Sequence, residues 1–82
     1  MKVEVLGPGC MKCQALLRNV EQVLAQSGIQ AEVVKVTDVF EIAARGVNRT
    51  PAIAVDGELK LQGRVATVDE IKGWLVGNSA AK

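Results

Sequence analysis

One long segment with helical periodicity, set between two short β-prone runs, constrains the fold of this chain more than any other feature. Apolar residues recur every three or four positions over residues 11–27, and Gly28 follows as a helix stop. Residues 3–6 precede this segment, residues 31–36 follow it, and both runs are rich in valine. A helix between two short strands is typical of a right-handed βαβ unit, so the two strands are expected to be parallel neighbours.

The next pattern along the chain predicts a β-hairpin. Residues 51–55 and 58–61 flank Asp56-Gly57, a dipeptide that supplies the positive φ angles of a two-residue hairpin turn. These two runs are therefore expected to be antiparallel strands.

Two further helices are indicated by their N-terminal caps. Asp38 with Glu41, and Thr67 with Glu70, have the three-residue spacing of a capping box. The first pair predicts a short helix between the second and third strands. The second pair predicts a closing helix, which Gly77 is expected to end.

The resulting element order is β-α-β-α-β-β-α, an α/β fold with a four-stranded mixed sheet flanked by helices. The chain has 82 residues, of which 49% are hydrophobic, and this is the profile of one compact domain. We expect the domain to cover residues 1–77 and a short C-terminal tail to cover residues 78–82.

Charge and hydropathy argue against several classes of partner. The net charge is +1, the charges are scattered, and only one Phe and one Trp are aromatic, so no nucleic-acid surface is expected. The apolar runs are far shorter than the roughly 18 residues that a membrane helix needs. Residues 1–2 lead directly into a strand-like run instead of a signal peptide, so we expect a cytoplasmic monomer without a membrane partner.

The chain has two cysteines and no histidine, which leaves one Cys-x-x-Cys pair to explain. Gly7-Pro8-Gly9 ends the first strand immediately before Cys10 and Cys13. Three residues apart in the first turn of a helix, the two thiols share one face and can form a reversible disulfide.

The two thiols are expected to have different roles. Cys10, at the helix entrance, meets the positive end of the helix dipole, and Lys12 adds a nearby cation, so both favour a nucleophilic thiolate. Cys13 continues the apolar stripe of Leu17 and Val20 and is expected to be shielded. Such a thiol suits the resolution of a mixed disulfide on Cys10.

Glu4 is a second candidate for tuning the thiols. It lies in an apolar strand that the topology makes central, where a partly buried carboxylate could move protons for Cys13. The alternative is a solvated carboxylate, or one paired with a lysine. Thr50-Pro51 opens the third strand, but this dipeptide alone does not indicate a cis peptide bond.

Several motifs in this order resemble the small redox-active disulfide proteins of bacteria and archaea, a thioredoxin-like family related to thioredoxins and glutaredoxins. The resemblance covers nearly the whole chain and is carried by residues 7–13, 37–38, 46–47, 50–52, 56–57 and 63–65. It implies a thioredoxin-like fold in which Cys10 attacks and Cys13 resolves. It also implies that Thr50 and Pro51 form a cis-proline loop that holds an extended substrate segment beside Cys10.

The sequence departs from its better-known relatives at informative positions. Ordinary thioredoxins have Trp before the first cysteine and Gly-Pro between the two, where this chain has Gly9 and Met11-Lys12. The stretch after Gly63 lacks the Gly-Gly and acidic pair that hold glutathione in glutaredoxins, which argues against glutathione dependence. Copper chaperones have Met two residues before the first cysteine, where this chain has Pro8, and their order is β-α-β-β-α-β.

The sequence therefore predicts a thiol-disulfide oxidoreductase that reduces or exchanges protein disulfides through a reversible Cys10–Cys13 disulfide. Its expected partners are protein disulfides and a dithiol reductant or reductase, and no cofactor or resident metal is expected. The alternative is a carrier of Cu(I) or another soft metal that uses the same dithiolate, since zinc would need two more ligands.

Overall fold

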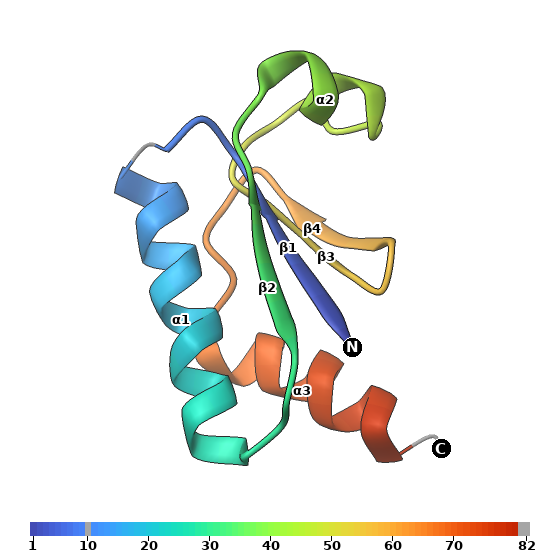
Figure 1. Cartoon of the computed structure of the whole chain (residues 1–82). Helices are drawn as coiled ribbons and strands as arrows, with labels where there is room; N and C mark the ends of the chain where they lie inside the picture. The colour runs from blue at the N-terminus through green and yellow to red at the C-terminus, as the bar shows by residue number, and fades with distance from the viewer. Residues whose placement is uncertain (10, 81–82) are drawn as a thin grey trace.

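The computed structural model describes residues 1–9 and 11–80, which form seven helices and strands (Figure 1). In chain order these are β1 (Lys2–Leu6), α1 (Met11–Ser27), β2 (Glu32–Val36), α2 (Val39–Ala44), β3 (Ala52–Val55), β4 (Glu58–Gln62) and α3 (Val68–Ala80). This is the β-α-β-α-β-β-α order that the sequence predicts. One boundary prediction is wrong, because α3 continues past Gly77 to Ala80. A glycine inside a helix costs only about 1 kcal/mol relative to alanine and does not force the helix to end.

The four strands form one mixed sheet in the order β2-β1-β3-β4. β1 and β2 are parallel, with Lys2 opposite Glu32 and Leu6 opposite Val36, which confirms the βαβ unit. β3 is antiparallel to both β1 and β4, which confirms the hairpin. β1 is therefore an interior strand, and its C-terminal end leads directly to the cysteine pair.

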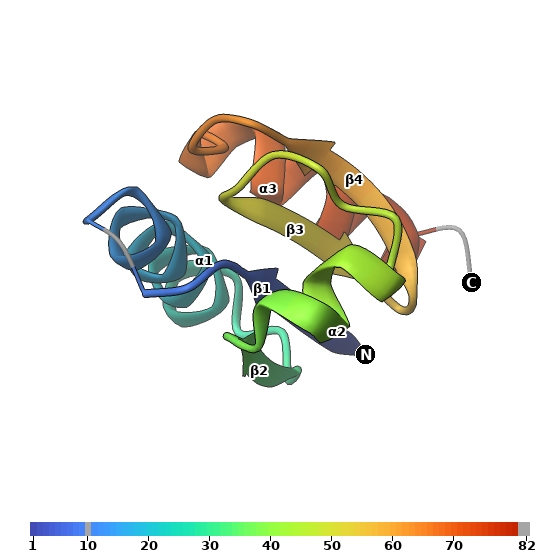
Figure 2. The same ribbon diagram turned by 90° about the horizontal axis from the view of Figure 1, so that it is seen from above.

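Helices cover both faces of the sheet, and Figure 2 shows α2 on the face opposite α1 and α3. The larger core lies between the sheet and the helices α1 and α3, and it includes Val3, Val5, Leu16, Val20 and Leu75. The smaller core lies under α2, and its buried residues are Leu6, Val36, Ile42, Val47, Ala52 and Ala54. Successive residues of β1 alternate between the two cores, as the period of a strand requires.

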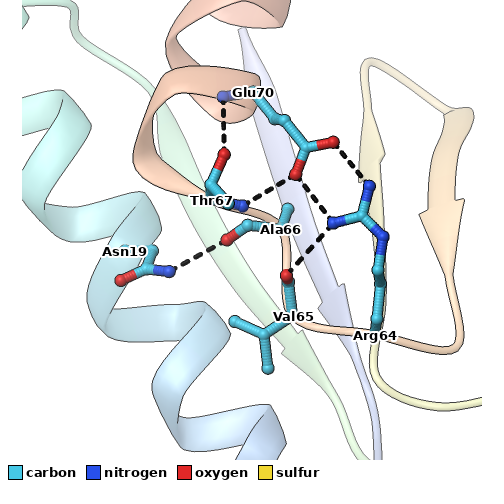
Figure 3. Close-up of polar contacts among 6 residues, drawn as sticks. All are labelled: Asn19, Arg64, Val65, Ala66, Thr67 and Glu70. Carbon is cyan, nitrogen blue, oxygen red and sulfur yellow. Dashed lines mark hydrogen bonds and ion pairs between the residues drawn. The ribbon is translucent and has the colours of Figure 1, made fainter.

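The N-terminus of α3 is held by the predicted capping box and by one arginine that the sequence did not suggest (Figure 3). The backbone N–H of Glu70 donates to Thr67 Oγ1 at 3.1 Å, and the N–H of Thr67 donates to Glu70 Oε1 at 2.9 Å. Arg64 binds both carboxylate oxygens of Glu70, at 2.8 and 2.6 Å. The hydrogen bonds from Arg64, with that from the Thr67 backbone, lower the pKa of Glu70 to about 2.

A buried ion pair joins β1 to the end of α2. Glu4 is only 5% exposed, and the Arg45 guanidinium donates to both of its carboxylate oxygens, at 2.8 and 2.5 Å. These hydrogen bonds lower the pKa of Glu4, against the opposite effect of burial. The ion pair thus holds α2, a helix of only six residues, against the centre of the sheet.

We expect Arg45→Met to lower the free energy of unfolding at pH 7, because it leaves a buried carboxylate without its cation. The loss should be about 2–3 kcal/mol, below the roughly 3–5 kcal/mol of fully buried pairs, since the Arg45 side chain is 30% exposed. Adding Glu4→Leu removes both charges and should restore at least half of the loss. Urea denaturation measures both changes, and a double variant as unstable as Arg45→Met would contradict this account.

The same loss should depend on pH. The pKa of Glu4 is lowered in the fold, so the ion pair stabilises the protein above the unfolded-state pKa of about 4.3. This stabilisation is lost as the pH falls through the pKa of the folded state. In Arg45→Met, burial without the cation raises the pKa of Glu4 instead, so the variant regains stability as the pH falls. The difference in unfolding free energy between the wild type and Arg45→Met should therefore be largest near neutral pH and shrink as the pH falls toward and below about 4.3, which urea denaturation at several pH values measures.

Candidate functional site

Cys13 lies in the first turn of α1, on the side that faces the sheet. It is 5% exposed and lies on the same buried face of the helix as Leu16 and Val20. The shielding that the apolar stripe predicts for this thiol is thus observed. Cys10 lies outside the described residues, and in the sequence it directly precedes Met11, the first residue of α1.

Gly7 brings three segments of the chain to one point. A Cβ atom built on Gly7 would overlap Cys13 Sγ, and it would lie 3.3 Å from Cys13 Cβ and 3.8 Å from Thr50 Cβ. The end of β1, the first turn of α1 and the loop before β3 therefore meet where Gly7 has no side chain. The sequence marks this position only as part of a strand-ending Gly-Pro-Gly cluster.

The loop before β3 is fixed by contacts with β4. The Thr50-Pro51 peptide bond is cis, and Pro51 is buried. The backbone N–H groups of Asn48 and Arg49 both donate to Gln62 Oε1, at 3.1 and 3.3 Å. These contacts hold the exposed Thr50 beside the buried Cys13, two residues that the sequence separates widely.

A pocket of about 140 Å³ opens beside Cys13 on the β2 side of the site. Its lining includes Val5 and Leu17, and Lys35 and Thr37 lie toward the exposed end. The remaining lining residues are Gly7, Gly9, Cys13 and Gln14. Cys13 therefore borders a partly open apolar space, although its own side chain is almost fully buried.

The two predicted tuning residues lie in different surroundings. Lys12 is exposed in the first turn of α1, between the two cysteines in sequence. Glu4 shares a sheet face with Leu6 and α2, whereas Val5 and Cys13 line the pocket on the other face. The structure thus pairs Glu4 with Arg45 and not with a lysine, and it does not bring Glu4 to Cys13. Proton transfer by Glu4 stays a prediction that this placement does not support.

Over residues 1–9 and 11–80, no group of three or more Cys, Asp, Glu or His side chains could hold a metal ion. In the same part of the chain, no helix is both long and apolar enough to cross a bilayer. No observation here favours the Cu(I) carrier.

Residues 1–76 match the family described as thioredoxin domain. The chain is 43% identical over 72 residues to a thioredoxin of Methanothermobacter thermautotrophicus, covering 88% of this chain and 94% of the relative. It is also 43% identical over 70 residues to a thioredoxin of Methanocaldococcus jannaschii, covering 85% and 80% respectively. Together with the mixed sheet and the buried Cys13 at the start of α1, these matches show that the chain belongs to the thioredoxin-like family of thiol-disulfide oxidoreductases.

Proposed function

We propose that this protein reduces or exchanges protein disulfides through a reversible disulfide between Cys10 and Cys13. The observation that carries the proposal is the meeting of Gly7, Cys13 and Thr50 at the start of α1, within a thioredoxin-like fold. This arrangement puts a buried thiol next to an exposed loop that a partner can reach.

The chemistry needs no group beyond the two cysteines and a substrate disulfide. The Cys10 thiolate attacks one sulfur of the substrate, a mixed disulfide forms, and the other substrate sulfur leaves as a thiolate. Cys13, as thiolate, then attacks Cys10 Sγ and releases the second substrate thiolate. The substrate gains two electrons, the protein loses two, and a dithiol donor must reduce Cys10–Cys13 again. In reverse, the same steps oxidise a dithiol.

Thr50 and Pro51 are the proposed substrate-binding residues. β3 begins at Ala52, so the exposed Thr50 precedes the paired part of that strand. An extended substrate segment can add to such a backbone through main-chain hydrogen bonds, which makes recognition tolerant of the substrate sequence. Its disulfide would then lie next to the N-terminus of α1.

The unequal roles of the two cysteines can be tested by trapping. Incubated in reduced form with an oxidised model protein, Cys13→Ser should accumulate a mixed disulfide on Cys10, because no thiol remains to resolve it. Cys10→Ser should accumulate almost none, since the remaining thiol is buried. Intact mass measured without reductant counts the trapped species. Equal trapping by the two variants would refute the assigned roles.

Gly7→Ala should damage the site although it replaces neither cysteine. The new methyl group would overlap Cys13 Sγ, so we expect a loss of about 1–3 kcal/mol in unfolding free energy. We also expect resolution of the mixed disulfide to slow more than the initial attack, because Cys13 must move. Urea denaturation and stopped-flow kinetics measure the two effects.

Gly73→Ala is the matched control for this variant. Gly73 lies within α3, and apart from its chain neighbours and the backbone of its own helix no atom lies within 4 Å of the position that its Cβ would take. The substitution should leave both redox steps unchanged and stabilise the protein by about 0.5–1 kcal/mol. If Gly7→Ala left the stability and both redox rates as Gly73→Ala does, the close contact of Gly7 with Cys13 would not matter for the reaction.

A further inference from the structure

Arg49 immediately precedes the cis-proline loop, and its side chain is held there by an unusual contact. A Cβ atom built on Gly63 would lie 3.3 Å from Arg49 Cδ, 3.5 Å from Arg49 Cβ and 4.0 Å from Arg49 Cγ. The stem of Arg49 therefore lies against the bare backbone of Gly63. Any side chain at position 63 would compete for this space, and the φ of +92° at Gly63 also disfavours one.

The backbone on both sides of this contact is fixed as well. The N–H of Arg49 donates to Gln62 Oε1 at 3.3 Å, and the N–H of Gly63 donates to the carbonyl of Pro51 at 3.0 Å. Figure 2 shows the segment before β3 and the segment after β4 side by side at this end of the sheet. An arginine held by its stem and backbone loses less conformational freedom when its guanidinium binds a partner.

Among the described residues, 1–9 and 11–80, Arg49 also belongs to no ion pair. In the part of the chain that the structure describes, the ion pairs join Glu4 to Arg45, Glu58 to Lys60 and Glu70 to Arg64. Arg64, the arginine just beyond Gly63, is thus already bound by a carboxylate. Arg49 is exposed and belongs to none of these pairs. Two other exposed cations near the site, Lys12 and Lys35, also belong to none of them.

We propose that Arg49 is a specificity-determining residue that selects substrate segments with an acidic residue close to the disulfide. The inference rests on the proposed function, since it assumes that such a segment lies along Thr50. A carboxylate on that segment would come next to the Arg49 guanidinium, whose planar fork binds carboxylates through two parallel hydrogen bonds. The occupant of this surface is therefore an extended acidic segment of a protein disulfide.

The test compares three synthetic peptide disulfides that differ only beside the cysteine, where they have Asp, Asn or Lys. At low ionic strength, the wild type should reduce the Asp peptide about two- to five-fold faster in kcat/KM than the Asn peptide, the range expected of an exposed ion pair. The Lys peptide should be slowest. The preference should disappear at about 1 M salt, where charges are screened within roughly 3 Å.

Variants assign the preference to one side chain. In Arg49→Gln the Asp-to-Asn ratio should fall to about one, and in Arg49→Lys it should be partly retained. Arg64→Gln is the matched control, because Glu70 already neutralises that arginine, and it should keep the wild-type ratio. Circular dichroism verifies that each variant is folded.

The outcomes separate this inference from the proposed function. An acidic preference that persists in Arg49→Gln, or that Lys12→Gln abolishes instead, overturns the role of Arg49. Equal reduction of all three peptides by the wild type overturns it too, but leaves the oxidoreductase proposal intact. Reduction of none of the peptides by the wild type would count against the proposed function itself.

Discussion

The approach of β1 to α1 at Gly7 is the contact on which the site depends. β1 is the interior strand from which the cysteine segment leaves the sheet, and its continuation passes directly against Cys13 Sγ. Only a residue without a side chain allows a helix to start so close to a strand end. Because Thr50 Cβ lies only 3.8 Å from the position that a Cβ on Gly7 would take, the loop before β3 lies close to the buried thiol as well. Helix, strand and loop are thus positioned together rather than one by one.

The two faces of the sheet differ in what they bury. α1 and α3 cover the face with the larger apolar core, and Cys13 lies at one end of that core. The other face has a short helix and a smaller core, and there the Glu4 carboxylate forms an ion pair with Arg45. Burial of an ion pair contributes less to stability than apolar packing of similar volume, but its fixed geometry holds α2 in one place. The candidate site therefore lies on the side of the sheet with the larger core.

Local sequence patterns predicted most of the fold. The helical stripe of residues 11–27, the Asp56-Gly57 turn and the Thr67–Glu70 box all act between residues close in the chain, and the structure has each of them. The burial of Cys13 followed from the same stripe. These features were predictable because their periodicity or spacing is visible in one dimension.

Apart from the Arg64–Glu70 pair and the extension of α3 past Gly77, the features that sequence reasoning missed join distant segments. Glu4 and Arg45 are 41 positions apart, and no periodicity relates them. Which face Glu4 occupies depends on the register of β1, since a shift of one residue exchanges the two faces. The contacts of Gly7 with Cys13 and of Gly63 with Arg49 depend on the close approach of two chain segments. A glycine in the sequence does not indicate which residue will lie against it in the fold.

The hydrogen bonds at the start of β1 have a practical consequence for handling the protein. The Lys2 N–H donates to Asp56 Oδ1 and the Asp56 N–H donates to the Lys2 carbonyl, both at 2.8 Å, so the beginning of the chain is tied to the hairpin turn. This turn lies at the end of the sheet opposite Gly7 and the first turn of α1 (Figure 1). An affinity tag or fused domain added before Met1 would therefore project away from Cys13, and immobilisation through that end would leave the surface around the start of α1 exposed.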